Sequence, residues 1–318
     1  MDLLPTDEQN EIVASVRAVL DDRHTLGEPL GDELWSAAAE QGWFGLGLRE
    51  ELGGVGYTLA EEALLFVELG RAGAPGPFLA TTVAAAAAAH AGDSELASSL
   101  LSGAARAAWV EPGPAGAVVL DGPGAAVGVT VGETVDLVDL GSVERGAAPP
   151  LDEHTPLERT TSMPSVVASS GDPTDVVRVS VLLAAQLAGI AEATTAQSVE
   201  YGKDREQFGQ PIGGFQAVKH RCADMAVRAE AAVMQVRMAA LATADGRSDA
   251  RFHADAARIV ATNAAIENAQ WNVQNHGGIG FTWEHTAHRF VTRARLLAGL
   301  AGGRYGALAD LLEQPPAA

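Results

Sequence analysis

The sequence predicts a mainly α-helical fold with a small β insert between two helical regions. Apolar residues recur at helical spacing up to about residue 103 and again from residue 173. Between these regions, short β-branched runs are punctuated by glycine and proline. We therefore expect an N-terminal helical domain over residues 1–103, a small middle β-domain over 104–172 and a C-terminal helical bundle over 173–318.

The N-terminal region predicts four helices. The first begins at Thr6 and Asp7, the second begins at Asp32, and the third is capped by Thr58. The fourth is the alanine-rich stretch TTVAAAAAAH, which is too short for a membrane span and is typical of a buried helix. Because the acidic start MDLLPTDEQNEIV lacks a long apolar run, we expect no signal peptide.

The middle region predicts a small sheet. We expect its strands in the valine-rich runs AAWVEPG, AVVLDG, VGVTVG and TVDLVDL, which glycine or proline residues separate. The following stretch, ERGAAPPLDEHTPLERTTSMP, contains several prolines and few apolar residues. We expect this stretch, residues 144–164, to be a loop.

The C-terminal region predicts a bundle of long helices. One helix is expected over DVVRVSVLLAAQLAGIAEATTAQSVEYGKDR, and others over about 249–274 and 284–298, before a short last helix and a disordered tail, EQPPAA. The helix that follows the first one carries an apolar stripe that predicts its buried face. This stripe consists of Phe215, Val218, Cys222, Met225, Ala229, Ala232 and Val236.

The composition limits the kinds of partner. The chain has 21 Lys and Arg against 41 Asp and Glu, a formal net charge of −20, which argues against binding to nucleic acid or to an anionic membrane. An anionic ligand then requires a local cluster of cations, and the two lysines, Lys203 and Lys219, flank one candidate. Cys222 is the only cysteine, which excludes an internal disulfide and favours a reducing cytoplasm.

Two stretches offer a place for an anion. Arg205 lies between a long helix and a Phe-Gly-x-Pro turn, where a guanidinium can bind a phosphate or, alternatively, stabilise the end of the helix. The stretch QNHGGIGF carries Gly277 and Gly278, whose backbone a ligand can approach closely. A tight turn between two helices is the alternative interpretation of these glycines.

Neither a metal motif nor a nucleophile motif is present. Glu284, His285 and His288 do not have the spacing of a di-iron or zinc site, so we expect them on a solvated helix face. His220 and His276 are expected in turns or at an interface. The chain also lacks a Gly-x-Ser-x-Gly elbow and a Cys/His pair.

Three stretches together resemble the acyl-CoA dehydrogenase family. YGKDREQFGQPIGGFQAVKHRCADM and WNVQNHGGIGFTWEHTAHRFVTRA resemble its two C-terminal signatures, and ELWSAAAEQGWFGLGLREELGGVGYTLAEEALLFVELGRAGAPGPFLAT is similar to its N-terminal helical domain. The resemblance covers residues 1–103 and 173 to about 300. It implies an N-terminal helical domain, a middle β-domain and a C-terminal four-helix bundle. It also implies flavin chemistry, in which a carboxylate takes the α-proton of an acyl-CoA and FAD takes the β-hydride.

The resemblance implies one half of a flavin site. In the family, the arginine of an Arg-x-Gln-Phe-Gly motif reaches across a dimer interface to FAD held mainly by the neighbouring subunit. The glutamine and phenylalanine of that motif line the adenosine and pyrophosphate region, and a Gln-x-x-Gly-Gly stretch makes a second contact across the interface. Lys203 and Lys219 are expected to be flanking interface charges. The cofactor-binding residues implied here are Arg205, Gln207, Phe208, Gln274, Gly277 and Gly278.

The chain departs from the family in the other half of the site. The middle region is reduced to about 70 residues and lacks the family's motifs that cover the flavin ring and the acyl-CoA. Ala301 and Gly302 occupy the place of the catalytic glutamate, and the first bundle helix, which carries the base in some members, reads VRVSVLL without a carboxylate. We therefore expect no catalytic residue and no metal site in this chain, which would be inactive alone.

These departures resemble the short, base-lacking subunits of heteromeric, α2β2 actinobacterial acyl-CoA dehydrogenases of steroid and cholesterol breakdown. The resemblance implies a cytoplasmic heterotetramer of lipid degradation that dehydrogenates a bulky acyl-CoA. In it, a full-length partner subunit carries the glutamate and most of the acyl-CoA site, and this chain completes the shared FAD site. One alternative is a self-sufficient homo-oligomer with a displaced base, and another is a flavin-free scaffold or regulatory paralogue. The candidates for a displaced base are four glutamates that we otherwise expect on helix surfaces or in structural roles: Glu192, Glu200, Glu206 and Glu284.

Overall fold

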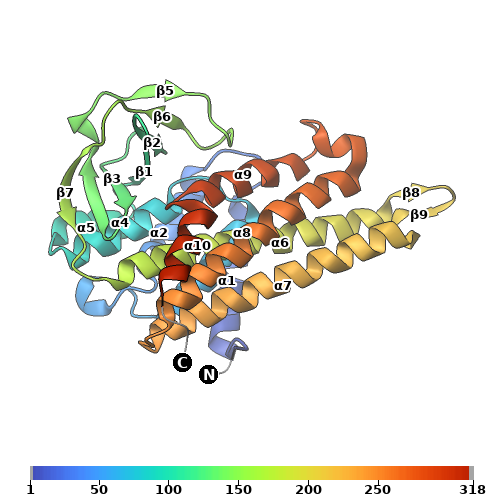
Figure 1. Ribbon diagram of the computed structural model, residues 1–318, viewed down its shortest axis with the longest axis horizontal. Coiled ribbons are helices and arrows are strands. Elements are labelled where there is room, and N and C mark those ends of the chain that lie inside the picture. Colours follow the sequence, from blue (N-terminus) through green and yellow to red (C-terminus); the bar gives the residue numbers. More distant parts are fainter. Residues whose placement is uncertain (1–2, 315–318) are drawn as a thin grey trace.

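The computed structural model describes residues 3–314 and confirms a mainly helical fold with a small sheet between two sets of helices (Figure 1). The helices before the sheet are α1 (Asp7–Arg23), α2 (Asp32–Glu40), α3 (Leu59–Ala72), α4 (Phe78–His90) and α5 (Ser94–Leu101). The helices after the sheet are α6 (Thr174–Asp204), α7 (Gln216–Ala244), α8 (Ala250–His276), α9 (Ala287–Gly299) and α10 (Gly303–Glu313). Short 3-10 helices are η1 (Trp43–Gly45), η2 (Glu50–Leu52), η3 (Leu140–Ser142), η4 (Ile212–Gly214) and η5 (Gly277–Phe281). Residues 315–318, most of the tail expected to be disordered, lie outside the described residues.

The first three N-terminal helices begin where the sequence predicts, whereas α5 was not predicted. Thr6 and Thr58 each accept a hydrogen bond from a backbone N–H of the first helical turn, while Gln9 and Glu61 reach back to the capping residue. The alanine-rich α4 is buried from Phe78 to Ala88. Its small side chains allow α5, α6 and the sheet to pack closely around it.

The sheet has seven strands in the order β5-β6-β2-β1-β3-β4-β7. Its strands are β1 (Ala107–Gly113), β2 (Gly116–Leu120), β3 (Val127–Val131), β4 (Val135–Asp139), β5 (Gly146–Ala148), β6 (Leu157–Arg159) and β7 (Ser165–Ser169). The four expected strands are β1 to β4. The expectation of a loop over residues 144–164 was wrong, because β5 and β6 lie in it. These strands have three residues each and form by pairing with β2 and with each other, so the stretch has no periodic signal of its own.

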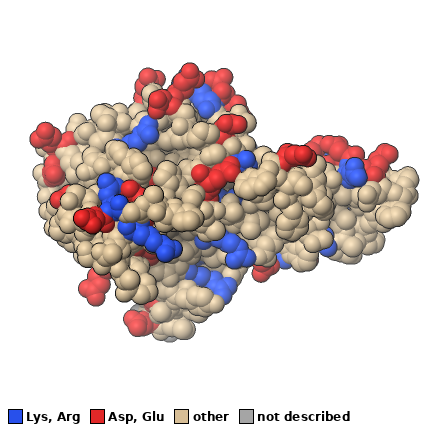
Figure 2. Space-filling model, turned by 90° about the horizontal axis from the view of Figure 1, so that it is seen from above, with Lys and Arg blue, Asp and Glu red and all other residues tan. Residues whose placement is uncertain are grey.

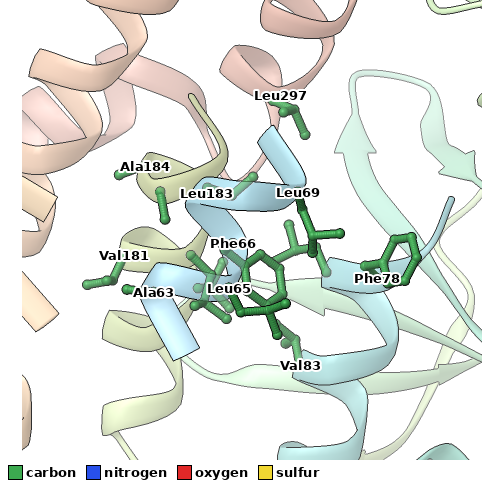
Figure 3. Packing of buried hydrophobic residues seen from close by; sticks show 14 of the residues in the cluster. Ala63, Leu65, Phe66, Leu69, Phe78, Val83, Val181, Leu183, Ala184 and Leu297 are labelled. Atoms are coloured by element: carbon green, nitrogen blue, oxygen red, sulfur yellow. The ribbon is translucent and has the colours of Figure 1, made fainter. Parts of the chain in front are cut away.

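The main hydrophobic core contains side chains both from helices that precede the sheet in the chain and from helices that follow it. Side chains from α3, α4 and α6 meet around Phe66, and Leu297 of α9 packs above them (Figure 3). The backbones of α3 and α6 touch, because a Cβ on Gly70 would lie 2.0 Å from the carbonyl oxygen of Gln186. A Cβ on Gly189 would lie 2.0 Å from the carbonyl oxygen of Val67. These two glycines therefore fix the N-terminal helices on the bundle.

The helices α6 and α7 extend beyond the rest of the chain and form an arm that ends in a small hairpin, β8 (Glu206–Gln207) and β9 (Gln210–Pro211) (Figure 1). The predicted apolar stripe of α7 is buried only in part. Its members from Met225 to Val236 are buried, whereas Phe215, Val218 and Cys222 are half-buried. These three residues lie on the arm, where fewer elements of the described chain cover α7.

The helix α6 is long and apolar enough to cross a membrane. However, 83% of its most apolar 18-residue window is buried inside the protein. This burial is typical of the central helix of a bundle, which passes the same test of length and composition. The cytoplasmic location stays a prediction.

Candidate functional site

A hairpin at the tip of the arm carries the first part of the candidate site. Its two-residue turn consists of Phe208 and Gly209, whose φ angles are 53° and 80°. Such turns favour Asn-Gly, because a side chain that branches into a bulky ring is strained at positive φ. The Phe208 side chain is also 91% exposed and has Phe215 edge-on to it at 6.1 Å between ring centroids. An exposed aromatic ring on a strained turn indicates a contact outside the described chain.

Arg205 directly precedes this hairpin. Its backbone is held on both sides, because its N–H donates to the carbonyl of Tyr201 at 2.9 Å and its carbonyl accepts from Ile212 at 2.8 Å. Its side chain is exposed and has no hydrogen bond or ion pair within residues 3–314. It therefore makes no hydrogen bond to the last carbonyls of α6. A fixed backbone with an unpaired guanidinium is well suited to binding an anion. Gln207, on β8, is exposed beside it.

The second part of the candidate site lies where α8 ends and η5 begins. Gln274 and Gly278 are exposed, and Gly277 is half-buried. Gly277 has φ 63° and ψ −140°, a combination that is accessible to glycine and strained for other residues. A Cβ added to Gly277 or Gly278 would have no atom within 4 Å, so the surface above them is open. A ligand can therefore approach this backbone closely.

Aromatic contacts hold the two parts at the same end of the molecule. Tyr201 on the last turn of α6 lies 4.2 Å from His276 between ring centroids, and His276 lies 4.3 Å from His285. His276 Nδ1 lies 2.7 Å from the carbonyl oxygen of Asn272, which fixes the ring. Burial lowers the pKa of His276, and burial with neighbouring histidines lowers the pKa of His285. Both rings are therefore mainly neutral at pH 7.

The expectation that His285 and His288 lie on a solvated helix face was wrong. Both side chains are half-buried, because the segment before α9 folds back onto α8. Both ring nitrogens of His288 are buried without a hydrogen-bond partner among the described residues, and Trp283 lies edge-on at 5.0 Å. Within residues 3–314, no three His, Cys, Asp or Glu side chains come together to hold a metal ion. The absence of a metal site stays a prediction.

The charges on the arm are mixed. Figure 2 shows acidic and basic side chains together along one face of the arm, while the end of the arm is uncharged on this face. Lys203 pairs with Glu200 at 3.2 Å, one turn before the hairpin. Lys219 lies at the start of α7 and lines the same apolar groove as Lys203. The two lysines therefore flank the hairpin from both helices of the arm.

The turn between α9 and α10 contains the place where the resemblance puts a catalytic glutamate. Ala301, Gly302 and Gly303 have φ angles of 49°, 72° and 62°, which make a tight left-handed turn. The carboxylate of Glu111 on β1 accepts hydrogen bonds from the backbone N–H groups of Ala301 at 2.8 Å and Gly302 at 3.3 Å. Trp109 Nε1 donates to the same carboxylate at 2.9 Å. The sheet therefore fastens this turn.

A cavity of about 30 Å³ lies beside this turn, lined by Leu300 and by side chains of α4, α6, α9 and the sheet. This volume holds about one or two water molecules, which is far less than an acyl chain needs. Asp121 supplies the carboxylate in its lining and has no side-chain hydrogen bond within residues 3–314. Burial raises the pKa of Asp121 to about 6. The Oε1 atom of Gln186, which also lines the cavity, has no partner among the described residues.

The four glutamates considered from the sequence do not line this cavity. Glu200, Glu206 and Glu284 are exposed, as expected. Glu192 was expected on the helix surface or in a structural role, but it lines a separate cavity between helices. Sequence interpretation missed Glu111 and Asp121, because a single acidic residue in a β region shows no sign of what it contacts across the fold.

Comparisons with known proteins place these features in a family. A family model described as acyl-CoA dehydrogenase, N-terminal domain, matches residues 6–108, and one described as acyl-CoA dehydrogenase, C-terminal domain, matches residues 177–304. Acyl-CoA dehydrogenase IpdE2 of Mycobacterium tuberculosis is 37% identical over 83% of this chain and 80% of its own length. Acyl-CoA dehydrogenase FadE34 of the same organism is 38% identical over 85% of this chain, which spans 40% of that protein.

Solved structures share the fold over nearly the whole chain. The Tcur3481-Tcur3483 steroid ACAD superposes with a TM-score of 0.82 at 26% identity, covering 96% of this chain and 97% of the other. The ChsE4-ChsE5 complex of Mycobacterium tuberculosis superposes with a TM-score of 0.81 at 24% identity, covering 99% of this chain and 100% of the other. Both neighbours are named as pairs of proteins. At 24% identity, the similarity to the ChsE4-ChsE5 complex shows the fold alone.

Proposed function

Because the chain belongs to the acyl-CoA dehydrogenase family, we propose that it is one subunit of a heteromeric, FAD-dependent dehydrogenase and completes the flavin site of its partner from across an interface. Arg205 carries this proposal. Its backbone is fixed, and its exposed guanidinium has no partner within residues 3–314. Such a group is placed to bind an anion that another chain brings to it.

The residues at the tip fit a flavin dinucleotide. The guanidinium of Arg205 can bind a pyrophosphate in a bidentate way, and the exposed ring of Phe208 offers a face to an adenine. The amides of Gln207 and Gln274 offer donors and acceptors, while Gly277 and Gly278 leave room for close approach. When bound, FAD supplies the acceptor for the β-hydride of the substrate. The residues of this chain bind and orient the cofactor.

The α9–α10 turn supports the assignment of proton abstraction to a different subunit. Ala301 has no group that accepts a proton, and Glu111 directs its oxygens at three N–H donors. The cavity of about 30 Å³ beside the turn leaves no space for an acyl group. We therefore assign the α-proton abstraction and most of the acyl-CoA site to a full-length partner. The neighbour named as a steroid ACAD, a pair of proteins, supports a heteromeric assembly and a steroid-derived acyl-CoA, and we propose an α2β2 arrangement and a bulky substrate.

The test is co-expression with a full-length family member of the same genome that carries the glutamate. We expect the purified complex to be yellow, to contain FAD and to dehydrogenate a steroid-derived acyl-CoA. We expect the lone chain to be colourless and inactive. Stoichiometric flavin and activity in the lone chain would overturn the proposal, because a half site retains neither.

Asp121 favours a second candidate function, the self-sufficient homo-oligomer with a displaced base. It is the carboxylate in the lining of the cavity beside the α9–α10 turn, and its pKa of about 6 suits a general base near neutral pH. If the lone chain is active, Asp121→Asn distinguishes the two, because only a displaced base makes this activity depend on Asp121. A flavin-free scaffold has no evident need for an unpaired Arg205 or an exposed Phe208.

A further inference from the structure

A second, larger cavity lies between α1, α3, α6 and α7. Its volume is about 350 Å³, which is within the usual range of small-molecule sites. It shares no lining residue with the cavity beside the α9–α10 turn or with the groove on the arm. Most of its lining is apolar and includes Val13, Ala63, Leu64, Val67, Val236 and Leu241. The flavin site does not use this cavity.

Two charged groups face this cavity without pairing. Glu192 on α6 has no hydrogen bond or ion pair within residues 3–314. Arg237 on α7 has its Nε atom buried without a partner among these residues, and its Nη1 reaches the carbonyl of Leu3 at 3.4 Å. An unpaired polar group in a buried place is costly, so a ligand that bonds to both groups would be favoured.

The charges around Glu192 favour an anionic head group. Arg17 on α1 forms a bidentate pair with Glu68 on α3 at 2.7 and 2.8 Å, and Arg71 donates to the same carboxylate at 2.6 Å. Burial raises the pKa of Glu192 and the nearby Glu68 raises it further, against the opposing effects of Arg17 and Arg237, while Glu230 on α7 also raises it. When Glu192 holds a proton, Arg237 is left as the uncompensated charge of the cavity.

A surface groove adjoins this cavity. The groove has a volume of about 540 Å³ and lies between α6 and α7, and Arg17 and Glu192 line both hollows. The side chain of Arg17 is 48% exposed although its guanidinium is paired with Glu68, so this part of the boundary faces solvent. The two hollows therefore adjoin at Arg17 and Glu192.

We propose that this cavity binds a small carboxylic acid with an apolar tail. The carboxylate of the ligand accepts hydrogen bonds from Arg237 and from protonated Glu192, and the tail lies among the apolar side chains of α1, α3 and α7. The site is independent of the flavin site, so either can exist without the other.

Decanoate is a suitable probe, with decanol and decylamine as matched ligands of the same tail. We expect calorimetric titration of the full chain at pH 6 to show one decanoate per chain, bound at least tenfold more tightly than decanol, and no binding of decylamine. Decanoate affinity falls as the pH rises and Glu192 ionises, because an ionised Glu192 repels the ligand. No decanoate binding, or decanol binding as tightly as decanoate, would overturn the proposal.

Three variants locate the site. Arg237→Gln weakens decanoate binding at least tenfold, and Ala63→Phe abolishes it by filling the cavity. Glu192→Gln keeps a hydrogen-bond donor and removes the loss of affinity at higher pH. Glu200→Gln, which changes an exposed carboxylate on the same helix, is the control and leaves binding unchanged. Unchanged binding in both Arg237→Gln and Ala63→Phe would place decanoate elsewhere and contradict the proposal.

Discussion

Arg205 combines a fixed backbone with a side chain that has no partner within residues 3–314. We expect Arg205→Ala to lower the flavin affinity of the complex by about 10- to 150-fold, because a pyrophosphate would lose a charge-assisted hydrogen bond of about 1.5–3 kcal/mol. Flavin absorbance per complex after dialysis measures this loss. Arg247→Ala is the control, since Arg247 follows the opposite end of α7 and pairs with Asp249. Equal flavin content in both variants would refute the role of Arg205.

Phe208 is retained on a turn that favours a smaller residue. We expect Phe208→Asn to keep or raise the stability of the lone chain by up to about 1 kcal/mol, because asparagine tolerates positive φ better than phenylalanine. The same change weakens assembly with the partner by about 2 kcal/mol, roughly thirtyfold, because an exposed aromatic anchor is lost. Urea unfolding and a titration of the partner give the two values. A less stable chain with unchanged assembly would make Phe208 a packing residue.

Asp121 makes stability depend on pH in a defined direction. Its folded-state pKa of about 6 lies above the ordinary value of 3.8, so the folded chain binds more protons than the unfolded chain between these values. Stability therefore falls as pH rises through this window, by up to about 3 kcal/mol. We expect Asp121→Asn to gain this amount in urea unfolding at pH 7.5 and almost nothing near pH 4. An equal gain at both pH values would exclude the titration of Asp121 as its cause.

At the scale of elements, the turn between α9 and α10 depends on strand β1. We expect Glu111→Ala to lower the free energy of unfolding by about 2–3 kcal/mol, because the N–H groups of Ala301 and Gly302 and the Trp109 ring N–H lose their acceptor. Glu111→Gln keeps one acceptor oxygen and costs less. Urea unfolding measures both, with Glu133→Ala as a control in an exposed turn of the sheet. Faster amide exchange at Ala301 and Gly302 accompanies the loss, and its absence would show that the turn holds itself.

The elements that the sequence predicted well are those whose signal is local. The caps at Thr6 and Thr58 mark the starts of α1 and α3, because the capping bonds lie within four residues. The strands β5 and β6 were missed because pairing with β2 defines them. Helical periodicity identified the buried face of α7 but not how far along it the covering elements reach.

In the candidate site, too, the residues with a local sequence signal were predicted and those defined by distant contacts were missed. Arg205 and Gly277 were found because they belong to contiguous motifs, although their roles toward FAD stay predictions. Glu111 was missed because it meets the α9–α10 turn from 190 residues earlier in the chain. The unpaired state of Glu192 was missed because helical spacing places a side chain on a face and does not show whether another helix brings it a partner.

At the scale of the whole molecule, the arm is the part whose apolar side chains the described chain covers only incompletely. The helices α6 and α7 carry Phe215, Val218 and Cys222 into a region where these apolar side chains are half-buried, and the tip ends in an exposed aromatic ring. The formal charge of −20 makes self-association unfavourable by repulsion. A different protein that covers the arm and supplies the rest of a flavin site would bury these side chains without the repulsion between two copies of this chain.

Cys222 allows the coverage of the arm to be measured, because it is the only cysteine of the chain and lines an apolar groove of about 450 Å³ with Lys203 and Lys219. Burial raises the pKa of its thiol, so the lone chain reacts with iodoacetamide slowly, and more readily at pH 8.5 than at pH 7. We expect the complex to react at least tenfold more slowly, as followed by intact-mass spectrometry, and Cys222→Ser to remain unlabelled. Equal rates in the lone chain and in a flavin-containing complex would mean that the partner binds the tip and leaves the groove open, since the thiol would then be equally accessible in both.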